Sequence, residues 1–189
     1  MKVVFMGPPG AGKGTQAQIV SEALGVPHIS TGDIFRANVG SGTPLGIEAK
    51  RYMDAGEYVP DSVTNAMVRD RISDPDCTPG FLLDGYPRTL DQVAQLDAML
   101  AEGGTALDRV VELTVVTDEV VQRLLLRAQT SGRSDDTEDV IRRRLEVYAE
   151  QTAPLTALYA SHGLLAQVDG MGTVDEVSAR ILAVLGIDA

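Results

Sequence analysis

The stretch Gly7-Pro-Pro-Gly-Ala-Gly-Lys-Gly-Thr15 decides the fold of this chain. The apolar run Val3–Met6 leads into it, and the helix-like run Thr15–Leu24 follows it. A glycine-rich turn with a lysine between a strand and a helix is typical of a loop that wraps phosphate, because glycines let successive N–H groups point at one anion. Lys13 adds a mobile positive charge for the outer phosphates, and Thr15 offers a hydroxyl to a bound magnesium ion. We therefore expect a nucleoside triphosphate here; a turn that only joins a strand to a helix fits Lys13 less well.

The spacing of this loop departs from the general pattern G-x-x-x-x-G-K-[ST]. Gly14 stands where serine or threonine is expected, and the hydroxyl comes one residue later, at Thr15. This departure narrows the set of phosphate-binding families that the chain can resemble.

Length, charge and cysteine content exclude several classes of protein. A chain of 189 residues with 44% hydrophobic and 23% charged residues has the composition of one globular domain. Its net charge of −11 argues against nucleic acid or an anionic membrane as the main partner, and no apolar run is long enough for a membrane span. The single cysteine excludes an internal disulfide and a cysteine-based zinc knuckle. We expect a cytoplasmic protein.

Short apolar runs alternate with helical patterns along the chain. The predicted strands are Val3–Met6, Pro27–Ser30 (the weakest), Phe81–Asp84, Val110–Val115 and Leu164–Val168. The predicted helices are Thr15–Leu24, Asp61–Ile72, Leu90–Leu100, Asp118–Arg127, Thr137–Tyr159 and Val174–Leu185. This alternation predicts the α/β class, with a parallel sheet covered by helices on both faces. Binding sites in such sheets lie at the carboxyl ends of the strands, so the motifs that follow strands should gather at one edge.

Two segments interrupt the alternation. Residues 31–60 carry helical patterns but no central strand, and residues 128–136 form a short polar loop between two helices. We interpret them as a helical flap and a short lid on one core domain. The alternative is that both are ordinary connections.

Two further motifs follow predicted strands. Ser30-Thr-Gly-Asp-Ile-Phe-Arg36 passes from a strand end into a helix, which Thr31 or Asp33 could simply cap. Asp84-Gly-Tyr-Pro-Arg88 places a carboxylate where it can orient magnesium through water. The planar fork of Arg88 suits phosphate, whereas a surface salt bridge is the alternative for this side chain.

Arginines gather around the polar loop. Arg123 and Arg127 share one helix face, and Arg133 lies in the loop itself. The consecutive residues 142–144 are arginines that fan around a helix, where Arg144 flanks the apolar seam and Arg143 points nearly opposite it, as a solvated surface charge. That seam consists of Ile141, Leu145, Tyr148, Thr152 and Leu155. Each arginine alone is more often solvated than a ligand, so convergence on a phosphate remains one of two alternatives.

Three residues of types that often carry chemistry are given no role. His28 and His162 are far apart in sequence and have no metal-ligand spacing, and Cys77 has no evident base partner.

Taken together, these motifs resemble the nucleoside monophosphate kinases, and specifically adenylate kinase in its bacterial short-lid form. The resemblance runs over essentially the whole chain and includes Gly7–Thr15, Ser30–Arg36, Asp84–Arg88 with Thr89 and Gln92, the pair Arg123 and Arg127, and the stretch from Arg133 to Arg144. It implies a P-loop three-layer sandwich with a central five-stranded parallel sheet. The single domain 1–189 would comprise a core (1–29, 60–125 and 133–189), an AMP-binding flap (30–59) and a short lid (126–132).

The resemblance also implies a role for each motif. ATP would be bound by Gly10, Ala11, Gly12, Lys13, Gly14, Thr15, Arg127 and Gly172. AMP would be bound by Thr31, Arg36, Glu57, Tyr58, Val59, Gly85, Tyr86, Pro87, Arg88, Gln92, Arg133 and Arg144. Lys13, Arg88, Arg123, Arg133 and Arg144 would act in catalysis, while Asp84, Asp33 and Thr15 would serve Mg²⁺. Gln92 would read the adenine edge, and residues 128–136 are too few for a zinc-binding lid.

The implied reaction is reversible transfer of the terminal phosphate of Mg-ATP to AMP, giving two ADP, by a protein expected to be a monomer. A kinase for UMP or CMP is a close alternative, although Thr31 favours AMP because pyrimidine-specific relatives commonly have alanine there. A nucleotide-binding switch without catalysis and a P-loop hydrolase are alternatives from other classes. Phosphoryl transfer needs positioning, charge neutralisation and exclusion of water, which closing segments and arginines supply.

Overall fold

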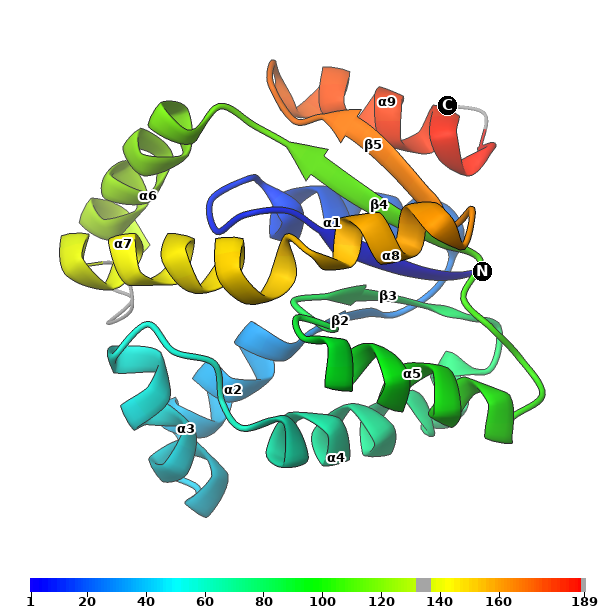
Figure 1. Ribbon diagram of the computed structural model, residues 1–189, viewed down its shortest axis with the longest axis horizontal. Coiled ribbons are helices and arrows are strands. Elements are labelled where there is room, and N and C mark those ends of the chain that lie inside the picture. The colour runs from blue at the N-terminus through cyan, green and yellow to red at the C-terminus, as the bar shows by residue number, and fades with distance from the viewer. Residues whose placement is uncertain (132–136, 188–189) are drawn as a thin grey trace.

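A five-stranded parallel sheet forms the centre of the computed structural model, which describes residues 1–131 and 137–187 (Figure 1). Its strands are β1 (Lys2–Met6), β2 (His28–Ser30), β3 (Phe81–Asp84), β4 (Arg109–Thr114) and β5 (Leu165–Asp169). They lie in the order β2-β3-β1-β4-β5, and each pairs in parallel with its neighbours. This confirms the α/β class and the five predicted strands.

The strand register brings the sequence motifs together. Phe5 of the central strand β1 pairs with Asp84 of β3, and Asp84 pairs in turn with Ser30 of β2. The residues that follow β1, β2 and β3 therefore leave the sheet side by side. They are the starts of the three motifs at Gly7, Thr31 and Gly85, which confirms that these motifs share one edge.

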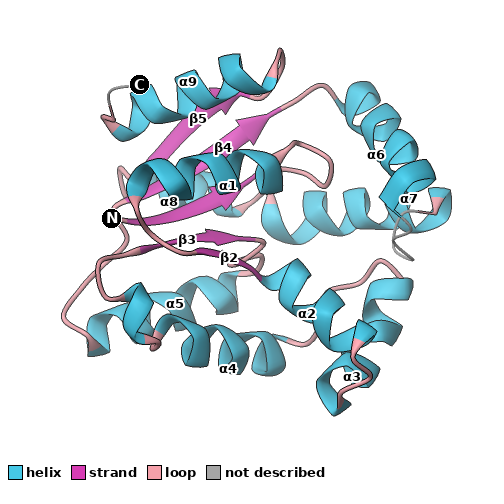
Figure 2. Ribbon diagram, turned by 180° about the vertical axis from the view of Figure 1, so that it is seen from behind, coloured by secondary structure: helices cyan, strands magenta, loops and turns pink. Residues whose placement is uncertain are grey.

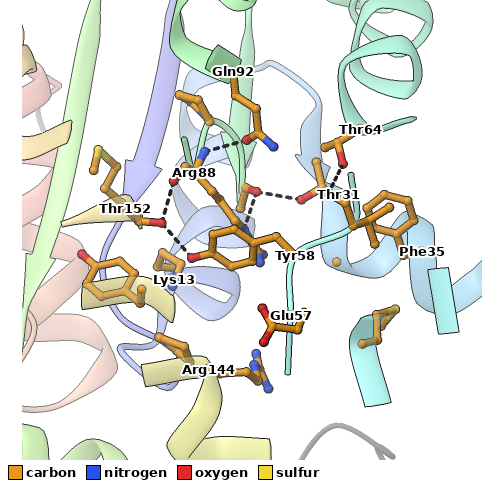
Figure 3. Close-up of a pocket in the computed structure, with 18 of the residues that line it drawn as sticks. Lys13, Thr31, Phe35, Glu57, Tyr58, Thr64, Arg88, Gln92, Arg144 and Thr152 are labelled. Atoms are coloured by element: carbon orange, nitrogen blue, oxygen red, sulfur yellow. Dashed lines mark hydrogen bonds between the residues drawn. The ribbon is translucent and has the colours of Figure 1, made fainter. Parts of the chain in front are cut away.

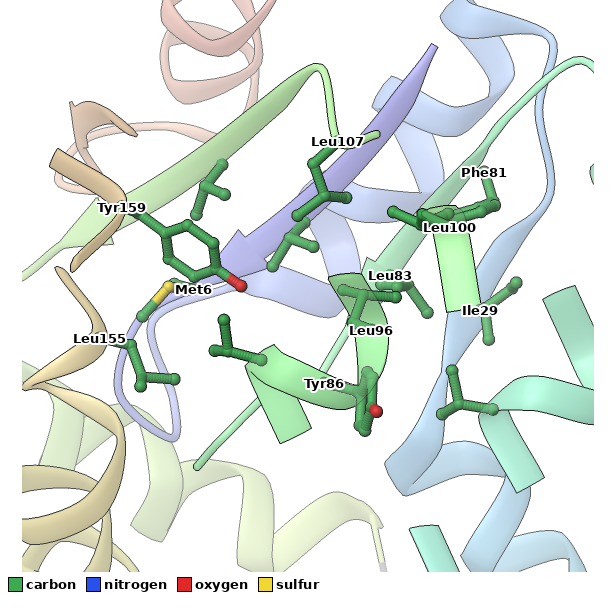
Figure 4. Packing of buried hydrophobic residues seen from close by; sticks show 14 of the residues in the cluster. Met6, Ile29, Phe81, Leu83, Tyr86, Leu96, Leu100, Leu107, Leu155 and Tyr159 are labelled. Carbon is green, nitrogen blue, oxygen red and sulfur yellow. The ribbon is translucent and has the colours of Figure 1, made fainter. Parts of the chain in front are cut away.

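Helices cover both faces of the sheet, as the sequence predicted. These helices are α1 (Lys13–Leu24), α4 (Asp61–Ile72), α5 (Leu90–Glu102), α8 (Leu155–Ser161) and α9 (Val174–Leu185). Val3 and Phe5 of β1 face α1 and α9, whereas Val4 and Met6 face α5 and α8. Figure 4 shows Met6 beside Leu155 and Tyr159 of α8. Alternate residues of a strand point to opposite faces, so one short apolar strand supplies both halves of the core.

Two short helices extend from the sheet edge at β2. They are α2 (Thr31–Gly40) and α3 (Pro44–Asp54), which lie together beside the end of the sheet (Figure 2). Phe35, Ala49 and Val59 form a small apolar cluster of their own. The flap segment (residues 30–59) thus has a cluster of its own, which Met67 of α4 joins to one of the two large clusters on the sheet.

The predicted helix Thr137–Tyr159 is not one helix. It consists of α7 (Glu138–Val147), a π-helical segment (Tyr148–Thr152) and α8, and α7 packs against the preceding helix α6 (Thr117–Ser131). Pro154 has no backbone N–H and its ring disfavours a continuing helix, so the α-helical pattern stops before it. Ala153 instead donates to the carbonyl of Tyr148, five residues back, at 2.9 Å. A one-turn 3-10 helix (Pro75–Cys77) completes the described elements.

Within the described ranges, no helix has the length and apolar character needed to span a membrane.

Candidate active site

The glycine-rich loop ends where α1 begins. Gly12, with φ of 92°, is the N-cap of α1, and no side chain caps that end. The first N–H groups of a helix have no partner inside the helix, and they carry the positive end of its dipole. The left-handed backbone at Gly12 favours glycine. The loop therefore presents an anion-binding helix terminus directly after the central strand.

Lys13 folds back along this loop. Its Nζ donates to the carbonyls of Gly7 at 2.7 Å and Pro8 at 3.0 Å. Burial lowers the pKa of Lys13 to about 8; the Asp84 carboxylate opposes this shift, and Arg88 and Arg144 add to it. A lysine in this environment gains from an incoming phosphate, which would supply the negative charge that the site lacks.

Asp84 ends β3 beside the loop. The residue is 9% exposed, and a Cβ built on Gly14 would lie 3.8 Å from its Oδ2. Burial raises the pKa of Asp84, but neighbouring His28, Lys13 and Arg88 outweigh that effect and hold it below its usual value. An ionised carboxylate beside a phosphate loop fits Mg²⁺, which commonly takes one or two carboxylates together with water and substrate phosphates. The residues thus fit the implied ion, with Asp84 and the exposed hydroxyl-bearing Thr15 on one cavity wall.

Two cavities meet at these residues. The first, of about 950 Å³ and called the flap cavity here, is bounded by the flap segment, the loop after β3 and the π-helical segment. The second, of about 1300 Å³ and called the loop cavity, is bounded by the glycine-rich loop and α6. Seven residues line both, namely Pro9, Lys13, Gly32, Arg36, Gly85, Arg88 and Arg144. Four of the seven are cationic, so positive charge concentrates where the cavities join, in a protein of net charge −11.

The flap cavity contains most of the predicted AMP-binding residues. Thr31, Arg36, Glu57, Tyr58, Val59, Gly85, Pro87, Arg88, Gln92 and Arg144 line it. Tyr86 does not line either cavity, because its side chain is buried in the core, where the hydroxyl donates to Asn65 Oδ1 at 2.8 Å.

Helix α2 is capped differently from the prediction. Ser30, rather than Thr31 or Asp33, is the N-cap, since its Oγ accepts from the Asp33 N–H at 3.2 Å. The Thr31 hydroxyl is thereby available to donate to the Gly85 carbonyl at 2.9 Å, and Asp33 pairs with Arg36. The capping alternative was therefore wrong for both residues.

Gln92 is held by two partners. Its Oε1 accepts the backbone N–H of Arg88 at 2.7 Å (Figure 3), and its Nε2 donates to Asp61 Oδ1, also at 2.7 Å. One amide hydrogen and one lone pair of the side chain remain for a ligand. These bonds fix the orientation of the amide in the cavity wall.

The loop cavity contains most of the predicted ATP-binding residues. Gly10, Gly12, Lys13, Gly14, Thr15 and Arg127 line it, together with the catalytic candidate Arg123 and with Asp84 and Asp33. Ala11 is buried behind the loop, where its N–H donates to the Pro8 carbonyl. Gly172 lies in the turn after β5, beside Glu176, and is outside the lining of both cavities.

The arginines separate into different surroundings. Arg123 lines the loop cavity while pairing with Glu119 at 3.0 Å, and Arg127 and Arg144 line it as well. Arg143 is not merely a solvated charge, because its Nε donates to Glu57 Oε1 at 2.7 Å and ties α7 to the flap segment. Arg133 and Gly132, the end of the predicted lid, lie outside the described residues.

Several cavity residues had no site role from the sequence, among them Tyr148, Thr152 and His28. Tyr148 and Thr152 were assigned to an apolar seam but line the flap cavity, and His28 lines the loop cavity. Nε2 of His28 lies 3.8 Å from Asp84 Oδ2, beyond hydrogen-bond distance. The sequence feature that could have indicated a site role for Thr152 is its hydroxyl, which lies in a mainly apolar helical seam.

Comparison with known proteins identifies the family to which this geometry belongs. The sequence profile described as "Adenylate kinase" matches residues 5–164. The chain belongs to the adenylate kinase family. It is 64% identical over 187 residues to an adenylate kinase of Nocardioides sp., with 99% of this chain and 98% of the relative covered. It is 61% identical over 184 residues to one of Kocuria rhizophila (97% and 98% covered) and 56% identical over 185 residues to one of Thermobifida fusca (98% of each). As an adenylate kinase, the protein is a phosphotransferase that acts reversibly between ATP and AMP.

Proposed function

We propose that the loop cavity binds Mg-ATP, that the flap cavity binds AMP, and that the terminal phosphate passes directly between them. The observation that carries this proposal is the shared wall of Lys13, Arg36, Arg88 and Arg144, which lines both cavities at once. The triphosphate of ATP and the single phosphate of AMP would meet there, and cations on both sides would neutralise their charge. In-line transfer needs this arrangement and little covalent help from the protein.

Most of the predicted residues then have a task. The N–H groups of the loop from Gly10 to Thr15 bind the donor phosphates, and Lys13 stabilises the negative charge on the phosphate during its transfer. Arg36 and Arg88 hold the AMP phosphate, Gln92 orients the base, and the Glu57–Val59 backbone borders the ribose side. Asp84, helped by Asp33 and by Thr15, would hold Mg²⁺ through water, and the ion would supply charge neutralisation between the phosphates. Arg123, Arg133 and Arg144 close around the phosphates, while Arg127 and Gly172 border the ATP base.

Exclusion of water completes the mechanism. The flap segment and the short lid (126–132) would close over both nucleotides, because open water would otherwise accept the phosphate from ATP. We further propose that the enzyme acts as a monomer in the cytoplasm, with no structural zinc.

A coupled assay with AMP, UMP and CMP tests the proposal. We expect AMP to be turned over fastest, with two ADP formed for each AMP consumed. Faster turnover of UMP or CMP would overturn the assignment of AMP. ATP hydrolysis without any acceptor, at the rate seen with AMP, would instead identify a hydrolase.

A further inference from the structure

Thr152 is a buried threonine at the end of the π-helical segment, in the wall of the flap cavity. It is 4% exposed, and its hydroxyl contacts two groups from distant parts of the chain (Figure 3). Thr152 Oγ1 donates to the backbone carbonyl of Arg88 at 2.8 Å and lies 2.7 Å from the Tyr58 hydroxyl. A threonine hydroxyl has one hydrogen, so Tyr58 must be the donor in the second bond.

Both partners of Thr152 act on the same guanidinium. The Tyr58 ring lies under the guanidinium carbon of Arg88, 4.9 Å from the ring centroid. Nε of Arg88 donates to the Gly85 carbonyl at 2.7 Å, which directs the remaining terminal nitrogens away from that carbonyl. Arg88 is thus restrained at its backbone by Thr152, at one face by Tyr58 and at Nε by Gly85.

The π-helical segment explains how Thr152 reaches this place. Arg144, Tyr148 and Thr152, four residues apart, all line the flap cavity. In an unbroken α-helix a spacing of four drifts around the axis with each step, so Thr152 would turn away from the wall. The bond from Ala153 N to Tyr148 O, five residues back, widens this turn and compensates for the drift. π-helical turns inside α-helices are frequent at functional sites.

We propose that Thr152 is a positioning residue for the acceptor phosphate: its hydroxyl joins Tyr58 of the flap segment to Arg88 of the core and so sets the direction of the Arg88 guanidinium. This rests on the proposed binding of AMP in the flap cavity. The hydroxyl serves the acceptor side, because neither Thr152 nor Tyr58 lines the loop cavity and because Arg88, which lines both cavities, holds the AMP phosphate in the proposed function. Loss of the hydroxyl therefore weakens AMP binding and leaves ATP binding unchanged.

The test compares Thr152→Val with Thr152→Ser. Valine keeps the shape but removes both hydrogen bonds, so we expect KM and Kd for AMP to rise about tenfold, with KM for ATP within about twofold of the wild type. Serine restores the hydroxyl, and its KM for AMP should return to within about twofold. Thr156→Val is the matched control, because the Thr156 hydroxyl donates to Glu112 Oε1 at 2.7 Å, away from the cavity. That variant should lose stability without any change in KM for AMP.

A second variant makes the test independent of the folding of Thr152→Val. Tyr58→Phe keeps the ring under Arg88 and removes only the hydroxyl, so we expect KM for AMP to rise about threefold. Combined with Thr152→Val, it should add nothing, because the bond between the two residues is already lost. An unchanged KM for AMP in the single variants, or an equal rise of KM for ATP, overturns the inference. Wild-type enzyme that does not use AMP overturns the proposed function itself, before any variant is measured.

Discussion

Lys13, for which we propose a role in phosphate transfer, carries a cost to stability. Its pKa is lowered by burial to about 8, whereas the unfolded chain keeps a value near 10.5. Between these two pH values the unfolded state binds more protons, so this group makes the protein more stable as pH rises through that range. At neutral pH, the buried charge of Lys13 is therefore a cost to folding.

Lys13→Met tests both the proposed role of Lys13 in phosphate transfer and the cost of its buried charge to folding. We expect phosphate transfer to fall by at least about a thousandfold, because the charge on the transferred phosphate loses its partner. The urea midpoint at pH 7 should equal or exceed that of the wild type, and the difference should shrink as pH rises from 8 towards 10.5. Lys50→Met is the control, since Lys50 is exposed and pairs only locally with Asp54 on α3. A Lys13→Met enzyme with normal turnover would refute the assigned role.

Cys77 is a residue whose burial predicts an absence of reactivity. It is the single cysteine of the chain and is 3% exposed. Burial raises the pKa of the Cys77 thiol to about 11, with the Arg71 guanidinium acting in the opposite direction. Little thiolate exists at pH 8, and the thiolate is the nucleophile.

We expect a chromogenic disulfide reagent at pH 8 to leave the native protein unmodified over an hour. The same reagent should titrate one thiol per chain as soon as urea unfolds the protein. Fast modification with an intact circular dichroism spectrum would show that the environment of Cys77 has been misjudged.

At the scale of elements, the sequence was sufficient where a pattern is local. Each predicted strand agrees with the observed one to within one residue, because a short apolar run in an α/β chain must be buried on both faces. The motif Asp84–Arg88 could likewise be placed at the sheet edge, since it directly follows a strand. The strand order was not predictable, because the apolar pattern does not encode which strand pairs with which.

The helix Thr137–Tyr159 shows where local reasoning failed. The apolar seam continues the α-helical spacing through Tyr148 and Thr152. Pro154 nevertheless disrupts the α-helical hydrogen bonds of the turn before it, because it has no backbone N–H. The π-helical turn then rotates Thr152 into the cavity wall. The bond of its hydroxyl to Arg88 spans 64 residues of sequence, and no periodicity reports a contact of that kind.

The contact between α2 and α3 gives a prediction at this scale. Gly46 is buried where the helices cross, and a Cβ there would lie 2.1 Å from the backbone oxygen of Asn38. Gly46→Ala must separate the helices, so we expect the flap segment to lose about 1–3 kcal/mol of stability and KM for AMP to rise while KM for ATP does not.

Gly40→Ala is the matched control for this variant. Gly40 ends α2, and a Cβ there would meet nothing within 4 Å, so alanine should be neutral or slightly stabilising. Amide hydrogen exchange should report faster opening of α2 and α3 in Gly46→Ala alone. Equal exchange in the two variants would mean that the crossing at Gly46 adapts without cost.

At the scale of the whole molecule, the residues that stabilise the fold differ from those that we propose for phosphate transfer. The fold is stabilised by two large apolar clusters, one on each face of the sheet, around Val4 and Leu83 and around Val3 and Phe5. In residues 1–131 and 137–187, no group of three or more His, Cys, Asp or Glu side chains could hold a metal ion. The proposed magnesium enters with the nucleotide, held by Asp84 through water and by phosphate oxygens.

Chelation should therefore separate activity from folding. With excess EDTA we expect phosphate transfer to be lost, because the donor phosphates keep their full charge, and added Mg²⁺ should restore it. The thermal midpoint of the nucleotide-free protein should stay within about 1 °C, since metal binding stabilises a fold only when the folded state holds the metal. Metal-free buffer without chelator is the control for the midpoint. A large drop in the midpoint with EDTA would reveal a structural metal and would contradict the view that the apolar clusters alone maintain the fold.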